Sequence, residues 1–240
     1  MKLVTRHLSL FTFFLFTFHL FTFTFSATFT DKIATTEYIF YTTFDGNKIL
    51  TTTEQITTII VNDEKIHQIK LEGSDGGWAR IYLKHDNLRP VSVNYYNADG
   101  SATKQLVYAE EQILVKLNNG QDQYSFPSNR KDYYDMNSFF HLMRGYPIEE
   151  KEIIFWSFLP EIHRGFLLYA KKLVQESISI KGKDYLCYKI EVGAAGLIES
   201  TLFPQKFYFW ITVAEPRQFI QYEGKDFMGN LQKTIVTSQY

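Results

Sequence analysis

The sequence predicts a mainly β protein: a large curved antiparallel sheet, or a two-sheet half-barrel, with one short helix inserted mid-chain. Three observations lead to this prediction. Aromatic residues make up 17% of the chain, and together with many β-branched residues they favour strands. Turn residues recur at short intervals between apolar runs, as they do in a meander of hairpins. No long helical pattern separates the strands, which argues against a parallel α/β sheet.

The first 26 residues are predicted to be a secretory signal peptide. Lys2 and Arg6 precede an apolar run over residues 8–25 that contains no acidic residue, which is the layout that export machinery recognises. We expect cleavage after Ser26. An uncleaved anchor is the alternative, because a helix of this length, at ~1.5 Å per residue, reaches roughly 27 Å, close to the thickness of a bilayer core. The predicted location is therefore periplasmic or secreted, with membrane contact only through residues 8–25 if the leader is retained.

Residues 27–240 are predicted to form a single β-rich domain with an internal break near residues 127–134. Removing residues 1–26 takes Lys2 and Arg6, and no acid, from 25 basic and 26 acidic residues, which leaves a net charge of −3. This weakly acidic, mixed balance offers no basic surface for nucleic acid. Cys187 is the only cysteine, so no intrachain disulfide can form.

Short strands are expected from residue 36 to residue 126, joined by turns whose Gly and Asn residues accept the positive φ of tight reversals. The predicted turns are Asp45-Gly46-Asn47, Asn62-Asp63-Glu64, Asn97-Ala98-Asp99-Gly100 and Asn118-Asn119-Gly120. Strands resume after the break, over residues 153–159, 165–180, 185–192, 206–213, 219–223 and 234–237. Two further hairpin turns are expected at Lys181-Gly182-Lys183-Asp184 and Glu223-Gly224-Lys225-Asp226.

A short helix is predicted from Met136 to about Arg144. Asp135 is placed to cap its N-terminus, and Gly145 and Pro147 end it. We expect structural roles for Asp135, as the cap, and for Arg144, as a cation near the C-terminal end of the helix dipole.

The helix carries one apolar face, because Met136, Phe139, Phe140 and Met143 fall at positions i, i+3, i+4 and i+7. Such a face ordinarily packs on a sheet. The abundant aromatic residues of the strands also allow an apolar ligand cavity between sheet and helix. The predicted ligand-binding residues are Phe139, Phe140, Met143, Trp156 and Trp210.

Motifs of catalysis are absent from the sequence, which has no nucleophile elbow, phosphate loop, dinucleotide fingerprint, zinc-spaced Cys/His set or His-Glu-x-x-His helix. We therefore predict no catalytic residues, no metal and no cofactor. A catalytic pair of Cys187 with His141 or His163 is the alternative to a single inert thiol, which is the expected state of Cys187.

A family resemblance rests on several short motifs in the C-terminal half. They are Asp135-x-x-Ser138 with Arg144 and Tyr146-Pro147, then Gly182 ahead of Cys187-Tyr188-Lys189-Ile190-Glu191, then Phe209-Trp210-Ile211 and Pro216-Arg217. Over roughly residues 76–238 the chain resembles a bacterial family of secreted or periplasmic domains of unknown function. That family is distantly similar to Lol-type lipoprotein carriers, in which a curved antiparallel sheet wraps short helices around an apolar cavity. The resemblance implies binding rather than catalysis.

The leading hypothesis is a non-enzymatic envelope protein that binds a hydrophobic small molecule or lipid-like group in a β-lined cavity. Two alternatives stay open. One is a structural or assembly partner of another envelope protein, which would use exposed sheet edges for strand addition. The other is an uncharacterised hydrolase that uses His141 or His163.

Overall fold

The computed structural model describes residues 29–46, 48–128, 132–196, 200–201, 204–225 and 231–239. The predicted signal peptide, residues 1–26, lies outside these residues. In the part of the chain that is described, no helix is both long enough and apolar enough to cross a membrane.

The first half of the chain is a meander of antiparallel hairpins. Its strands are β1 (Thr36–Asp45), β2 (Lys48–Val61), β3 (Glu64–Gly73), β4 (Trp78–Lys84), β5 (Pro90–Tyr96), β6 (Ala102–Tyr108), β7 (Gln112–Leu117) and β8 (Asp122–Pro127). The 3-10 turn η2 (Asn118–Gly120) joins β7 to β8. Asn62 and Asp63 between β2 and β3 have φ of 49° and 65°, and Asn119 has φ of 59°. The predicted turn residues at these two places thus adopt the left-handed conformation that tight reversals use.

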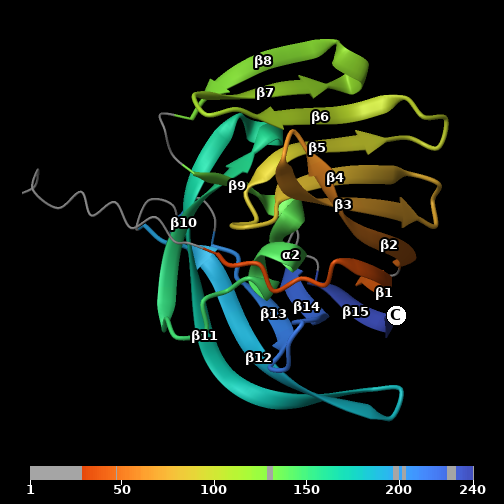
Figure 1. Ribbon diagram of the computed structural model, residues 1–240, viewed down its shortest axis with the longest axis vertical. Helices are drawn as coiled ribbons and strands as arrows, with labels where there is room; N and C mark the ends of the chain where they lie inside the picture. The colour runs from red at the N-terminus through yellow and green to blue at the C-terminus, as the bar shows by residue number, and fades with distance from the viewer. Residues whose placement is uncertain are drawn as a thin grey trace, which may run out of the picture.

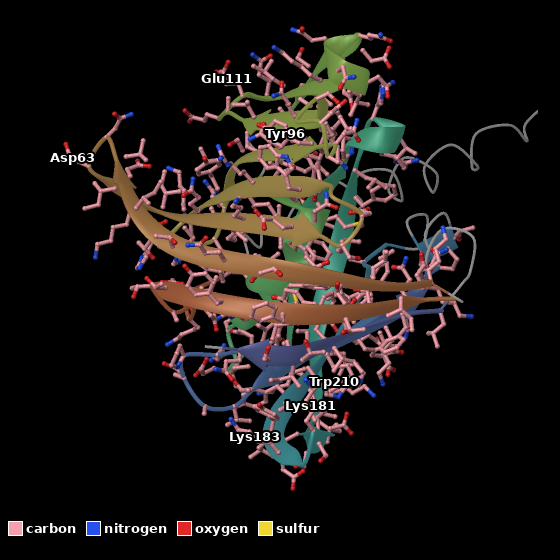
Figure 2. All side chains as sticks on the ribbon, turned by 90° about the vertical axis from the view of Figure 1, so that its right-hand side faces the viewer. Asp63, Tyr96, Glu111, Lys181, Lys183 and Trp210 are labelled. Carbon is pink, nitrogen blue, oxygen red and sulfur yellow. The ribbon has the colours of Figure 1, made fainter. Side chains whose placement is uncertain are left out.

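The second half begins with a short strand and the helix and then returns to hairpins. Its elements are β9 (Tyr133–Asp135), η3 (Met136–Ser138), α2 (Phe139–Arg144), β10 (Glu152–Leu159), η4 (Pro160–Ile162), β11 (Arg164–Ile180), β12 (Lys183–Ala194), β13 (Phe207–Thr212), β14 (Phe219–Lys225) and β15 (Leu231–Gln239). The β2–β3 and β11–β12 hairpins are long, and Asp63 and Lys181 lie at their turns (Figure 2).

All these strands belong to one sheet, in the order β8-β7-β6-β5-β4-β3-β2-β1-β15-β14-β13-β12-β11-β10-β9. β1 and β15, the first and last strands of the described residues, pair in the middle of this sheet. β8 and β9 form its two edges, so the sheet stays open. The sheet curves around α2, which lies in its concavity (Figure 1). The prediction of a mainly β fold with one large curved sheet and one short helix is confirmed, and of its two forms the single sheet is the one observed.

Two details differ from the sequence prediction. The sheet is not wholly antiparallel, because β9 and β10 pair in parallel, with Trp156 opposite Tyr133. The helical segment between them carries the chain back along the sheet, which is the crossover that a parallel pair requires. The predicted turn at residues 223–226 is wrong for its first three residues. Residues 223–225 continue β14 and pair with β15, because Gly224 adopts an extended conformation and leaves room for the rings of Tyr222 and Phe207.

Asp135 is buried at the start of the helical segment. Its Oδ1 accepts a hydrogen bond from the backbone N–H of Asn137 at 2.8 Å, and its Oδ2 accepts one from the Tyr108 hydroxyl at 2.6 Å. Asp135 therefore caps the 3-10 turn that leads into α2 and also links that turn to β6. Burial raises the pKa of the Asp135 carboxyl, although the hydrogen bonds that it accepts oppose this effect.

Arg144, the last residue of α2, is 0% exposed and forms a buried ion pair with β1. Its Nη2 donates to Glu37 Oε2 at 2.7 Å, and its Nε donates to the backbone carbonyl of Arg217 at 2.5 Å. Arg217 in turn donates to the carbonyl oxygens of Tyr146 and Arg144, at 2.6 and 3.2 Å. Arg144 thus lies at the C-terminal end of α2, and its hydrogen bonds to β1 and to the segment before β14 hold it in place. Burial raises the pKa of Glu37, and the positive charge of Arg144 works against that rise.

We predict that Glu37→Ala destabilises the protein by about 3–5 kcal/mol, because it leaves the guanidinium of Arg144 buried and without its counter-charge. The free energy of unfolding from urea titrations measures this loss. Glu72→Ala is the matched control, because Glu72 pairs with Lys70 on the surface, where such pairs contribute at most about 1 kcal/mol. Equal losses in the two variants would contradict this role of the buried pair.

Candidate functional site

A cavity of about 260 Å³ lies between the helical segment and the concave face of the sheet. Three sides of it come from different parts of the chain: η3 and α2, strands β13 to β15, and strand β5. Its lining residues are Tyr95, Met136, Asn137, Phe139, Phe140, Phe207, Phe209, Tyr222, Gln232 and Thr234. Aromatic side chains dominate this lining, with a few polar groups beside them, as is typical of small-molecule sites.

Strand alternation explains which side chains of β13 reach the cavity. Phe207 and Phe209 point to the concave face and pack with the main core, while Trp210 packs in a separate small cluster with Cys187 and Ile220. Successive side chains of a strand face opposite sides of the sheet, so Phe209 and Trp210 cannot serve the same cavity.

Phe140 is the centre of a cluster of aromatic rings, of which those of Phe140, Phe209 and Tyr222 line the cavity. Its ring stacks on that of Phe219, with centroids 4.3 Å apart and an interplanar angle of 12°. The rings of Tyr222, Tyr41 and Phe209 surround it at 5.6, 6.0 and 6.2 Å. Phe140 remains half-buried even with these contacts, so part of its ring is available to a ligand.

The structure brings only two of the five predicted ligand-binding residues, Phe139 and Phe140, to the cavity. Met143 is fully buried in the core, and Trp156 lies beside Tyr133 with ring centroids 5.8 Å apart. Trp210 lies on the opposite face of β13 (Figure 2), where its Nε1 donates to Glu176 at 2.5 Å. The lining aromatic residues that the sequence analysis missed are Tyr95, Phe207, Phe209 and Tyr222. Those of β13 could have been found from the alternation that starts at Phe207.

The alternative catalytic pair was Cys187 with either His141 or His163, and these three residues lie in different surroundings. His141 is buried with its Nε2 3.4 Å from Glu54 Oε2. His163 is exposed and stacks on Tyr124, with ring centroids 3.9 Å apart. Cys187 lies in the cluster with Trp210, and burial together with the nearby charge of Glu176 raises the pKa of its thiol to about 12. A reactive cysteine needs a lowered thiol pKa, so this environment disfavours Cys187 as a nucleophile.

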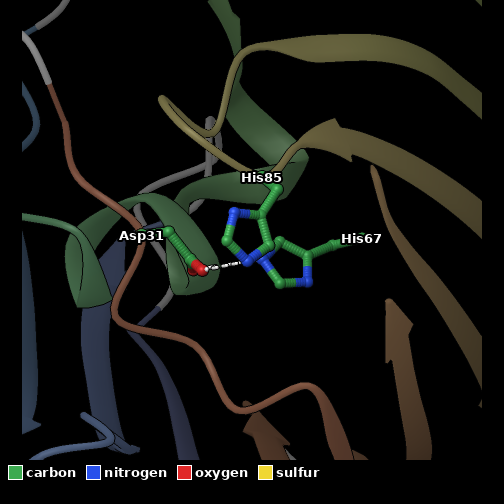
Figure 3. Close-up of side chains that lie close together, drawn as sticks. All are labelled: Asp31, His67 and His85. Atoms are coloured by element: carbon green, nitrogen blue, oxygen red, sulfur yellow. Dashed lines mark hydrogen bonds and ion pairs between the residues drawn. The ribbon is translucent and has the colours of Figure 1, made fainter. Parts of the chain in front are cut away.

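A second group of polar side chains comes together near the start of β1. Asp31 precedes β1, His67 lies on β3, and His85 directly follows β4. His67 Nε2 donates to Asp31 Oδ1, and His85 Nε2 donates to Asp31 Oδ2, each at 3.0 Å (Figure 3). The two imidazole rings stack, with centroids 5.0 Å apart. Burial opposes ionisation of Asp31, but the hydrogen bond from His67 and the backbone N–H of Ile33 outweigh it and lower the pKa of the carboxyl.

The sequence prediction included no metal-ligating residue, because the members of this group do not show the short Cys/His spacing that indicates a metal site. Asp31 is 36 residues from His67. A signal for the two histidines exists in the hairpin pattern, because His67 pairs with Leu83 across β3 and β4. A residue two positions beyond Leu83 points to the same face, which places His85 beside His67.

Comparisons with known proteins give weak structural similarities. No protein-family model and no curated protein matches this chain. A β-barrel-like protein of the domain of unknown function DUF1849 from Brucella abortus is 8% identical, covers 89% of this chain and 98% of its own, and has a TM-score of 0.49. YmcC from Escherichia coli, described as a hypothetical lipoprotein, is 16% identical over 84% of each chain, with a TM-score of 0.32.

A protein from Bacteroides fragilis, described as exported and with a YmcC-like fold, is 8% identical over 89% of this chain and 100% of its own, with a TM-score of 0.33. These three are bacterial proteins whose descriptions name an unknown-function domain, an exported protein and a lipoprotein. None of the three descriptions names a Lol-type carrier. Similarities at this level carry no statement about function.

We predict that Cys187 in the folded protein reacts with iodoacetamide at least about tenfold more slowly than in the urea-unfolded protein, because burial both covers the thiol and disfavours its thiolate. The mass increase of the intact protein with time measures both rates. A native rate equal to that of free cysteine would contradict this environment and would return Cys187 to the candidates for a nucleophile.

Proposed function

We propose that the protein is a non-enzymatic envelope protein that binds a hydrophobic small molecule or a lipid-like group in the cavity between α2 and the sheet. The observation that carries the proposal is the aromatic lining of that cavity, built from helix and sheet together. The envelope location rests on the predicted signal peptide. The sequence resemblance to a family distantly similar to Lol-type carriers supports the same kind of function.

The size of the cavity limits what it can hold. Sites for drug-sized ligands have volumes of about 300–1,000 Å³, so a cavity of about 260 Å³ suits one short apolar chain or ring rather than a whole lipid. Burial of roughly 300 Å² of apolar surface would contribute on the order of 7 kcal/mol before the cost of association. We therefore expect a dissociation constant in the micromolar range or weaker.

The polar residues of the lining supply a place for a ligand's polar end. Asn137, Gln232 and Thr234 are the polar members of the lining, and Asn137 is exposed. Thr234 already shares a hydrogen bond of 3.0 Å with Thr43, and Asn137 Nδ2 already donates to Asp135 Oδ1 at 3.0 Å. The side-chain oxygen of Asn137 can still accept a hydrogen bond, and the amide of Gln232 can donate and accept. An amphipathic ligand would thus place its apolar end against Phe140 and its polar end toward Asn137 and Gln232.

The proposal includes no catalytic step in the cavity. His141, His163 and Cys187 are not among the described residues that line it.

Co-purification of another protein together with a lack of saturable probe binding would favour the assembly-partner alternative instead.

We predict that the protein binds a fluorescent fatty-acid probe saturably at one site, and that Phe140→Asp weakens this binding at least about tenfold by placing a charge in the apolar lining. Fluorescence titration measures the dissociation constant, and circular dichroism checks the fold. Phe44→Asp is the matched control, because Phe44 is 40% exposed on β1 and lies outside the lining.

A second variant keeps this test decisive if Phe140→Asp unfolds. Gln232→Trp is expected to narrow the cavity from β15, where Gln232 is half-buried, and so to weaken probe binding without placing a charge in it. Unchanged binding in a folded Phe140→Asp or Gln232→Trp variant, or an equal loss in Phe44→Asp, would contradict the assignment of the cavity.

A further inference from the structure

We propose that Asp31, His67 and His85 form a binding site for a divalent transition-metal ion, of the type that binds zinc. This site uses the N-terminal segment and the β3–β4 hairpin, and none of its three residues lines the cavity described above. The inference therefore goes beyond the proposed ligand binding and does not depend on it.

The three side chains are of the types that bind divalent transition metals. Two imidazole nitrogens and one carboxylate are the protein ligands of many zinc sites that keep one further position open, and the same set binds non-haem iron. The three ligand atoms all lie within 4.8 Å of one another, and each Nε2 is 3.0 Å from a carboxylate oxygen. Tetrahedral coordination with bonds of ~2 Å separates ligand atoms by about 3.3 Å, so small side-chain rotations are enough to close the site around an ion.

Neighbouring groups orient two of the three ligands. Thr58 Oγ1 lies 3.1 Å from His67 Nδ1 and can accept a hydrogen bond from it once Nε2 binds a metal. The backbone N–H of Ile33 donates to Asp31 Oδ1 at 3.0 Å and orients the carboxylate. Metal-binding histidines usually have such a partner on the second ring nitrogen, because it fixes the tautomer and the ring orientation.

The group of three ligands can be reached from solvent. The exposed fraction of the side chain rises from 0% for His67 to 13% for Asp31 and 30% for His85, so the group is buried on one side and open on the other. A hollow of about 280 Å³ borders His85 and is also lined by Glu64, Lys65, Lys84 and Asp86. An ion can enter through this hollow, and a water molecule or an external ligand can occupy the remaining coordination position.

A bound ion would connect the segment before β1 to the β3–β4 hairpin. That segment is already held by Phe29, which is fully buried, and by the backbone N–H of Thr30, which donates to the carbonyl of Gly145 at 3.0 Å. Because the ion would bind the folded protein and not the separated ligands of the unfolded chain, metal binding should stabilise the fold.

The test is zinc binding by the protein purified without an affinity tag, stripped with chelator and titrated with ZnCl2 by calorimetry. We expect one equivalent of Zn²⁺ to bind and the midpoint of thermal unfolding to rise. His85→Ala should weaken the affinity at least about tenfold and abolish the rise in the midpoint, and Thr58→Val should weaken it by roughly 10–100-fold through the lost orientation of His67.

His163→Ala is the matched control, because His163 is exposed and stacks on Tyr124, away from the three ligands. Its affinity for zinc should equal that of the unaltered protein. Absorption bands of bound Co²⁺ in the visible range, present in the unaltered protein and lost in His85→Ala, would support the same ligands by a second method. The proposal is overturned if the stripped protein takes up no zinc at micromolar concentration, or if His85→Ala binds it as tightly as the unaltered protein.

Discussion

The buried ion pair between Arg144 and Glu37 fixes α2 inside the curved sheet. Glu37 belongs to β1, the strand at the middle of the sheet, and Arg144 ends α2. The side chain of Arg217 adds to this arrangement by donating to the carbonyl oxygen of Arg144, at the end of the helix, and to that of Tyr146, just after it. This helix therefore cannot slide along the concave face without leaving a buried charge uncompensated, and the position of Phe140 follows from that constraint.

The cavity exists because the helix is too short to cover the concave face. Six residues of α2 extend about 9 Å, whereas the nine residues of β15 extend about 30 Å. Aromatic side chains of β13 and β14 contact Phe139 and Phe140 of α2, and a space remains beside these contacts. A cavity wall that is fixed by a buried ion pair is preorganised, which reduces the ordering cost of binding a ligand.

Local patterns in the sequence were sufficient for most of the hairpins, for the helix and for the large curved sheet, because turn residues and side-chain periodicity are local properties. They could not predict the pairing of β1 with β15, which joins residues nearly 200 positions apart. They also could not assign the face of Trp210. Phe209 and Trp210 are both buried, on opposite faces of one strand, so a continuous apolar run does not tell which side is the concave one. The group of Asp31, His67 and His85 was not predicted for a similar reason, because its three members come together only in the folded chain.

The most direct test of the central claim is native mass spectrometry of the full chain isolated from cells that produce it, followed by organic extraction and lipid analysis. If α2 and the sheet enclose a binding site for an apolar group, the protein should carry one such molecule per chain, released by the solvent. A mass equal to that of the polypeptide alone, in the presence of excess fatty acid or phospholipid, would contradict it.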